Sequence, residues 1–311
     1  MVLVLVEQTD GKVADPSLQA LTLARSFAQP VDALLMGTAA DLTQHGVSVA
    51  HVAEHVALGS FAPDAWAAVL HQLAVSLNAS AVLAAGTERG NEVMARLSAR
   101  TGLPLAANCI AVSPGPPVTL TRQRWGGSLL EEARLNSERP LITVAPHVVP
   151  IEPAPMPAAI ERFAPELTDS DLLVRVVERV AAVGGGISLT EAKVVVSGGR
   201  GVGSKEGFGM IEELAGLLGA AVGCSRAVTS AGWRPHTDQV GQTGTKIAPE
   251  VYIACGISGA TQHMAGCKGA KRILAINSDA QAPIMLSADY AVVGDLKEIV
   301  PAISAEIRKS R

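Results

Sequence analysis

Short apolar runs alternate with helix-spaced segments through the first half of the chain. Apolar runs of four to six residues bounded by polar positions predict buried strands, whereas apolar residues spaced three to four apart predict helices. The predicted strands are 2–6, 31–36, 81–85 and 141–145, and the predicted helices are 18–27, 64–77 and 88–101. Such alternation is typical of βα units around a mostly parallel sheet.

A proline-rich segment at 150–157 interrupts this rhythm. Four prolines within eight residues exclude a helix or a central strand, so we expect the segment to leave the sheet. Residues 172–182 fit either a strand or a helix, and three glycines at 184–186 form a flexible break. We therefore predict an N-terminal domain at 1–183, which contains the proline-rich segment, and a C-terminal domain at 187–311.

The βα rhythm restarts in the second domain. Five short strands are predicted there, at 193–196, 220–222, 251–254, 272–276 and 290–293. Between the first two, Ser204 is placed to cap a helix that Gly219 ends. The predicted fold class is α/β, with two domains that each hold a mostly parallel sheet flanked by helices, the C-terminal one being Rossmann-like.

Charge and composition exclude several classes of function. The 311 residues carry a net charge of −4 without a basic stripe, which argues against nucleic-acid binding. No apolar run is long enough to insert in a membrane, and the run at 2–6 is too short for a signal peptide, so we expect a cytoplasmic protein. The four cysteines form no C-x-x-C pair, which favours buried thiols over a metal site.

Polar and glycine-rich residues follow each predicted strand of the second domain. In an open α/β sheet, ligands bind beyond the carboxyl ends of the strands. These ends carry Ser197 to Gly201 with Arg200, then Ser225 and Arg226, then Gly256 to Gly259, then Asn277, and finally Gly294 and Asp295. Glycines let a backbone approach a pyrophosphate, and an arginine adds a fixed positive charge. The sequence therefore predicts a dinucleotide site at this rim.

Two further segments contribute polar groups. Val240-Gly241-Gln242-Thr243-Gly244 offers an amide and a hydroxyl for ring heteroatoms or sugar hydroxyls, and the alternative is a simple tight loop. Ser258 to His263 opens a helix, where backbone donors favour negative charge, but a histidine at such a position is often structural.

A nicotinamide-dependent dehydrogenase is the first alternative. The glycine spacing Gly199-x-Gly201-x-Gly203 departs from the G-x-G-x-x-G fingerprint of that class. The second strand ends in Gly223-Cys224-Ser225-Arg226, without the acidic residue that binds a ribose hydroxyl. Both departures favour another dinucleotide.

The ordered set of motifs in the last 120 or so residues resembles the electron transfer flavoprotein alpha subunit. The motifs are Val194 to Gly201, Gly223 to Ala227, Val240 to Gly244, Ala248 to Ala254, Gly256 to His263, Ala275 to Asn277, Ala282 to Ile284 and Ala288 to Tyr290. The first domain is similar more loosely, through its opening strand and the segment from Trp125 to Ser128.

This resemblance implies FAD as the cofactor, held by the C-terminal domain, and an N-terminal domain that packs on a beta subunit. It further implies an electron carrier without its own substrate site, which accepts electrons from flavin dehydrogenases such as acyl-CoA dehydrogenases and passes them to a membrane quinone oxidoreductase or a similar acceptor. A non-redox interaction subunit of the same fold is the remaining alternative.

Carried over by motif, the implied FAD contacts are Arg200, Ser225, Arg226, Val240, Gly241, Gln242, Thr243, Ser258, Gly259, Ala260, Thr261, Gln262, His263, Asn277 and Asp295. Arg226 and His263 would favour the negative charge of a reduced flavin, and Thr243 would hydrogen-bond the ring near N5. These are electrostatic roles, so no nucleophile or general base is expected.

Overall fold

The computed structural model describes residues 1–9, 11–127, 129–178 and 187–310. The chain divides into two compact units, Met1–Arg179 and Val180–Arg311. The predicted glycine break at 184–186 lies outside the described residues. Each unit is an α/β domain, as the alternation of apolar runs and helical spacing predicts.

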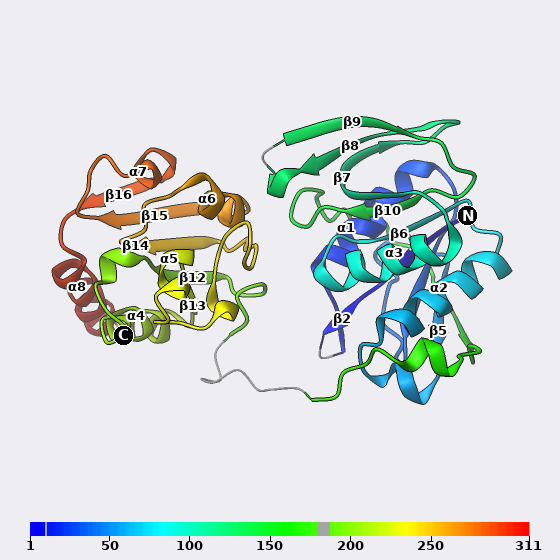
Figure 1. Cartoon of the computed structure of the whole chain (residues 1–311), viewed down its shortest axis with the longest axis horizontal. Helices are drawn as coiled ribbons and strands as arrows, with labels where there is room; N and C mark the ends of the chain where they lie inside the picture. The colour runs from blue at the N-terminus through cyan, green and yellow to red at the C-terminus, as the bar shows by residue number, and fades with distance from the viewer. Residues whose placement is uncertain (10, 128, 179–186, 311) are drawn as a thin grey trace. The chain divides into compact units, whose positions relative to one another are not determined.

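The N-terminal unit begins with a fully buried strand and alternates strands with helices (Figure 1). Its elements are β1 (Val2–Leu5), β2 (Gln8–Thr9), β3 (Lys12–Val13), α1 (Asp15–Ala24), β4 (Val31–Met36), β5 (Val49–Ala53), α2 (Pro63–Ser76), β6 (Ala81–Ala85), α3 (Glu88–Thr101), β7 (Leu105–Ser113), β8 (Val118–Arg124), β9 (Leu129–Leu135), β10 (Leu141–Val144) and β11 (Ala159–Phe163). Short 3-10 turns connect several of them, including η4 (Asp169–Leu172).

Nine strands of this unit form one sheet in the order β11-β5-β4-β1-β6-β10-β7-β8-β9. The seven strands from β11 to β7 are parallel, and β8 and β9 extend the sheet as an antiparallel hairpin. The helix α1 packs on one face with Leu21, whereas α2 and α3 cover the other face with Leu70 and Met94. These side chains are fully buried, and each such burial contributes about 1.5–3 kcal/mol.

Two parts of this unit differ from the prediction. The strands β5, β7, β8, β9 and β11 were not predicted, because most of them carry polar or exposed positions rather than an apolar run. The proline-rich segment, by contrast, forms no helix or strand, as predicted, apart from an isolated bridge between Ala154 and His45. The expectation of a strand or helix at 172–182 is wrong for 173–178, which have no regular structure, and 179–182 lie outside the described residues.

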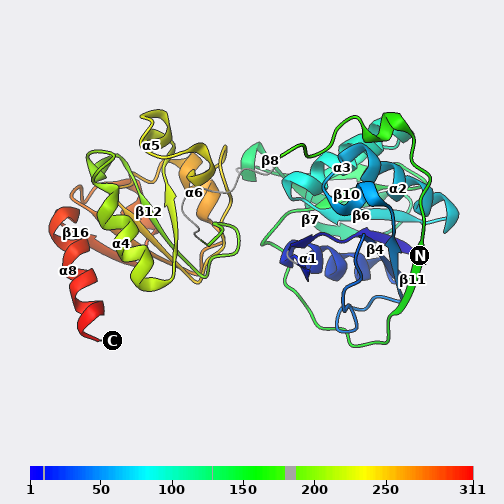
Figure 2. The same ribbon diagram turned by 90° about the horizontal axis from the view of Figure 1, so that it is seen from below.

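The C-terminal unit contains a five-stranded parallel sheet in the order β13-β12-β14-β15-β16 (Figure 1). Figure 2 shows β12 between α4 on one side and α6 on the other. Its elements are β12 (Val194–Gly198), α4 (Phe208–Leu218), β13 (Ala221–Cys224), α5 (Arg226–Ser230), β14 (Val251–Cys255), α6 (Thr261–Cys267), β15 (Arg272–Asn277), α7 (Pro283–Ser287), β16 (Tyr290–Val293) and α8 (Leu296–Lys309). All five strands coincide with predicted ones.

Helices α4 and α8 cover one face of this sheet, and α6, α7 and the segment before β14 cover the other. The predicted apolar face of α4 packs as expected, and the left-handed Gly219 ends the helix. The Ser204 hydroxyl accepts a hydrogen bond from the Gly207 backbone at 3.2 Å, but in the turn before the helix rather than as its cap. The sheet therefore carries two apolar layers below a polar rim.

Candidate functional site

The strand order of the C-terminal unit places a topological switch point between β12 and β14. The chain leaves β12 for β13 on one side and then crosses to β14 on the other. In doubly wound sheets such a point is where loops diverge and ligands bind. The two loops that follow these strands contain Gly199, Gly201 and Gly256.

These three glycines lie against one another. The Gly201 backbone donates to the Gly256 carbonyl at 3.1 Å, and a Cβ on Gly199 would lie 2.1 Å from that same oxygen. Gly256 also has a φ of +63°, which favours glycine. The glycines therefore let two loops pack backbone to backbone, which is a structural reason for them beyond any approach to a phosphate.

The segment Val240–Thr243 crosses the rim between the two sides of the switch point. The Val240 backbone donates to the Cys224 carbonyl at the end of β13, at 2.9 Å. The Gln242 backbone donates to the Gln262 carbonyl in α6, at 2.7 Å. A Cβ on Gly266 would lie 2.3 Å from the Gly241 nitrogen, so the segment Val240–Thr243 packs directly on α6. The structure thus brings together two of the predicted binding segments, 240–243 and 258–263.

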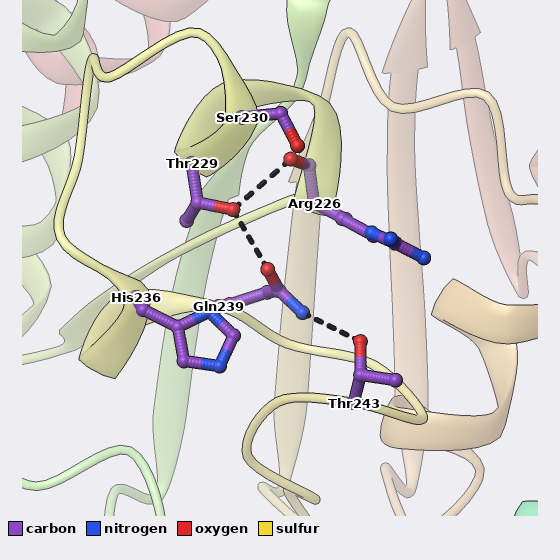
Figure 3. A pocket seen from close by; sticks show the side chains of 6 residues that line it. All are labelled: Arg226, Thr229, Ser230, His236, Gln239 and Thr243. Atoms are coloured by element: carbon purple, nitrogen blue, oxygen red, sulfur yellow. Dashed lines mark hydrogen bonds between the residues drawn. The ribbon is translucent and has the colours of Figure 1, made fainter.

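A pocket of about 420 Å³ opens beside this crossing, at the carboxyl end of β13 (Figure 3). Its lining residues are Arg226, Thr229, Ser230, His236, Gln239 and Thr243. Arg226 and Thr243 were predicted as site residues. The other four were missed, because their loop has no apolar pattern and the family motifs do not include them.

Polar contacts organise the floor of the pocket. The Gln239 side chain is almost fully buried and is hydrogen-bonded at both ends, to the hydroxyls of Thr229 and Thr243. Arg226, at the start of α5, is exposed, and none of the carboxylates in the described residues forms an ion pair with it. The pocket therefore holds a permanent positive charge that an anionic ligand would meet without competition.

His263 lies in the first turn of α6 with its side chain in the core. Its Nε2 and the Tyr252 hydroxyl are 2.7 Å apart, and its Nδ1 is buried with no hydrogen-bond partner among the described residues. Burial lowers the pKa of His263 to about 4, and the Val240 backbone opposes this shift only in part. A neutral imidazole stabilises an anion only by donating a hydrogen bond, so positive charge comes from Arg226 instead.

Other predicted contacts stabilise the rim itself. The Asn277 amide donates to the Ile257 carbonyl at 3.0 Å and accepts from the Asp279 backbone at 3.1 Å. The Asp295 carboxylate caps α8 by accepting from the Lys297 backbone at 2.9 Å. Ser225 precedes α5 as its N-cap residue, although its side chain makes no capping bond.

The loop after β14 packs just as closely on its neighbour. Gly259 has a φ of +79°, and a Cβ there would lie 2.4 Å from the Ile284 nitrogen. The Ser258 carbonyl accepts from that nitrogen at 3.0 Å. Ala260 then precedes α6, and Thr261 is its first residue.

Arg200 lies in the exposed turn after β12, on the α8 side of the switch point. The turn approaches α8, since a Cβ on Gly203 would lie 3.9 Å from the Lys297 ammonium nitrogen. Lys297 is a third cation of the rim, after Arg200 and Arg226, and sequence reasoning missed it. The pocket lining contains Arg226 and Thr243 but neither Arg200 nor Asp295, so the predicted residues line a rim rather than a single cavity.

The remaining side-chain chemistry is sparse. In the described ranges no group of three or more His, Cys, Asp or Glu residues is arranged to hold a metal ion. All four cysteines are buried and unpaired, as predicted, and burial raises the pKa of the Cys224, Cys255 and Cys267 thiols to about 12. Within the same described residues, no helix is both long and apolar enough to cross a membrane.

Comparison with known proteins decides between the dinucleotides. Residues 2–168 match the electron transfer flavoprotein domain, and residues 188–268 match the electron transfer flavoprotein FAD-binding domain. The chain belongs to the electron transfer flavoprotein alpha subunit family. Its cofactor is FAD, and the nicotinamide alternative has no support.

Relatives of this family align over nearly the whole chain. Electron transfer flavoprotein subunit alpha of Mycobacterium leprae is 40% identical over 315 residues, which cover 98% of each protein. The corresponding subunit of Bacillus subtilis is 36% identical over 320 residues, 99% of this chain and 97% of that protein. Protein FixB of Clostridium saccharobutylicum is 36% identical over 98% of this chain and 96% of its own length. Proteins of this family are electron carriers rather than typical substrate-converting enzymes.

The residues present fit FAD. The guanidinium of Arg226, which has no ion-pair partner among the described residues, and the hydroxyl of Thr243 offer a cation and a hydrogen-bonding group to an electron-rich ring. The cations Arg200 and Lys297 lie apart from that pocket, on the α8 side of the rim. Such a separation of charges suits a ligand with a ring at one end and a pyrophosphate in the middle.

Proposed function

We propose that the C-terminal unit holds FAD across the rim, with its ring over the pocket of Arg226 and Thr243 and its pyrophosphate toward Arg200. The supporting observation is the Arg226 guanidinium, which lines the pocket without an ion-pair partner among the described residues. The bound flavin supplies the electron-carrying chemistry. The residues around it supply binding, orientation and charge.

The proposed contacts divide by role. Arg200 binds phosphate oxygens, and Arg226 stabilises negative charge on the reduced ring. Thr243 hydrogen-bonds the ring near N5, while Val240 and Gly241 hold Thr243 and Gln242 against α6. The remaining proposed contacts are Ser225, Ser258 to His263, Asn277 and Asp295. Of these, Asn277 and Asp295 contribute by holding the loops in place.

We further propose that the N-terminal unit packs on a beta subunit and that the complete protein is a heterodimer. It accepts electrons from flavin dehydrogenases, such as acyl-CoA dehydrogenases, and passes them to a membrane quinone oxidoreductase or a similar acceptor. It has no substrate site of its own. Membership of a family of electron carriers supports this proposal.

The test uses the heterodimer produced with its beta subunit. The flavin released from wild type should be FAD, bound and reducible by a dehydrogenase in a dye-coupled assay. The variant Arg226→Ala should keep FAD but show a lower reduction potential, because the reduced ring loses a stabilising charge. The variant Arg200→Ala should instead bind FAD more weakly.

Arg308→Ala is the matched control, because Arg308 lies on α8 and pairs with Glu213 at 2.8 Å. It should change neither the potential nor the affinity. An unchanged potential in Arg226→Ala would remove Arg226 from the flavin ring. A heterodimer that binds FAD but takes electrons from no dehydrogenase would instead favour an interaction subunit.

A further inference from the structure

Gln239 lies at the floor of the pocket with both ends of its amide engaged (Figure 3). Its Oε1 accepts from the Thr229 hydroxyl at 2.7 Å, and its Nε2 donates to the Thr243 hydroxyl at 3.0 Å. Only 2% of the residue is exposed. Gln239 therefore determines how the Thr243 hydroxyl presents itself to the pocket.

The protons of this network can be counted. Thr229 has one hydroxyl proton but two acceptors within reach, the Gln239 Oε1 at 2.7 Å and the Arg226 carbonyl at 3.0 Å. When Thr229 donates to Gln239, the Arg226 carbonyl goes without that proton. Thr243 then accepts from Gln239, so its own hydroxyl proton points into the pocket and Thr243 is a donor there.

A half-turn of the amide gives the opposite arrangement. The two ends of a glutamine amide have the same shape, so exchanging Oε1 and Nε2 moves no neighbouring atom. Nε2 then donates to Thr229, and Thr229 donates to the Arg226 carbonyl. Oε1 accepts the proton of Thr243, which now presents only lone pairs to the pocket. Both arrangements satisfy the amide, and they differ in whether Thr243 donates or accepts.

The backbone of Gln239 is fixed while this happens. Its N–H donates to the His236 carbonyl at 3.0 Å, and its carbonyl accepts from the Thr245 backbone at 2.7 Å. A Cβ on Gly244 would lie 2.2 Å from that carbonyl oxygen, so the loop packs tightly around it. The terminal torsion of a glutamine is soft and roughly two-fold, and it is the part left free to move.

We propose that the Gln239 amide is a two-position element that switches Thr243 between donor and acceptor as the flavin changes its redox state. This inference rests on the proposed placement of the ring. The N5 atom of an oxidised flavin only accepts a hydrogen bond, whereas after uptake of two electrons and a proton it carries a hydrogen. Gln239 exchanges hydrogen bonds with its neighbours and gives up no proton. An ionised glutamate at this position would only accept hydrogen bonds, and a leucine would neither donate nor accept them.

Infrared difference spectroscopy on the heterodimer tests the half-turn directly. The protein is labelled with glutamine carrying ¹³C at its side-chain carbonyl, and spectra of the oxidised and reduced states are subtracted. The Gln239 carbonyl band should move to higher wavenumber on reduction, because its partner changes from Thr229 at 2.7 Å to Thr243 at 3.0 Å. Gln239→Met identifies the band by removing it. Gln281→Met is the control that should leave the band, because the Gln281 side chain is exposed and lies outside the proposed FAD contacts.

Variants of Thr243 separate switching from a merely structural role. Thr243→Val removes the hydroxyl and should abolish the redox-dependent movement of the band, whereas Thr243→Ser should preserve it. The FAD content of each sample is measured first by absorbance. If the wild-type protein holds FAD but the band does not move, the switch is wrong and the FAD site stands. If the heterodimer binds no FAD, the proposed function fails together with the switch.

Discussion

The Tyr252 hydroxyl and the Nε2 atom of His263 lie 2.7 Å apart in the core of the C-terminal unit. Tyr252 is fully buried, and its pKa is raised well above the ordinary value, by burial first and by Cys267 second. The phenol is therefore protonated and can donate to Nε2. That donation leaves the proton of a neutral imidazole on Nδ1, the buried atom without a partner among the described residues.

The depressed pKa of His263 predicts a pH dependence of stability. Its folded pKa of about 4 lies below the ordinary histidine pKa of 6.5. Between these values the unfolded chain binds a proton that the folded chain does not, so stability falls as the pH drops from about 6.5 to 4. The loss across this window is roughly 3 kcal/mol, at 1.36 kcal/mol per pKa unit.

Denaturant unfolding of the apoprotein at pH 7.5, 6 and 5 measures this effect. The variant His263→Gln does not titrate in this range and should lose less stability than wild type as the pH falls. Parallel losses in the two proteins would show that folding does not lower the pKa of His263.

Tyr252→Phe should destabilise the C-terminal unit by about 1–3 kcal/mol, because it leaves a buried imidazole nitrogen without its partner. The chain offers a matched control in its only other tyrosine, Tyr290, which is 64% exposed. Tyr290→Phe should be nearly neutral. Urea unfolding of the two variants side by side makes the comparison, and equal stabilities would contradict a structural role for the Tyr252 hydroxyl.

The strands of the C-terminal sheet could be predicted because the signal for each one lies within its own few residues. Parallel strands buried on both faces appear as continuous apolar runs, as in Val194-Val195-Val196. The hairpin of β8 and β9 has no such run, since β8 buries only Val118 and Leu120 and β9 buries no residue. The strand β11 is an edge strand with four exposed residues, and only its pairing with β5 makes it a strand.

The residues of the candidate site likewise divide into those that the sequence predicts and those that it does not. Arg226 and Thr243 could be predicted as lining residues, because each lies in a segment that resembles the family, Gly223 to Ala227 and Val240 to Gly244. Gln239 could not, because its role depends on partners that lie ten positions before it and four after it and meet only in the folded loop. The inward turn of His263 toward Tyr252 depends likewise on the packing of α6 against the sheet, which spacing does not encode.

Gly199→Ala should destabilise the rim and weaken FAD binding. Its Cβ would lie 2.1 Å from the Gly256 carbonyl oxygen, so one of the two loops must move. We expect a loss of stability of about 2 kcal/mol or more, as for other overpacked sites.

Gly209→Ala is the control, because that glycine is exposed in α4 with nothing within 4 Å of its Cβ position. It should stabilise the helix by roughly 0.5–1 kcal/mol. Thermal unfolding measures the change in stability of each variant, and FAD titration measures the change in its affinity for FAD.

Glu7 provides a pH-dependent prediction for the N-terminal unit. Its carboxyl group lies at the end of β1, accepts from the Thr87 hydroxyl at 2.5 Å and is 7% exposed. Burial raises the pKa of Glu7 above 4.5, although Thr87 and Arg89 partly offset the rise. The folded state therefore binds a proton more readily than the unfolded state. That stabilisation is fully present below pH 4.5 and is lost as the pH rises through the folded pKa.

Glu7→Gln should consequently stabilise the N-terminal unit at neutral and alkaline pH. Glutamine keeps an oxygen that accepts from Thr87 and removes the buried charge. Denaturant midpoints for wild type and variant should converge at pH 4 and separate as the pH rises to 8. Glu166→Gln is the control for the loss of one charge, because Glu166 uses its backbone N–H and carbonyl to contact Gln72. If Glu7→Gln is less stable than wild type at pH 8, the buried carboxylate is better solvated than its surroundings indicate.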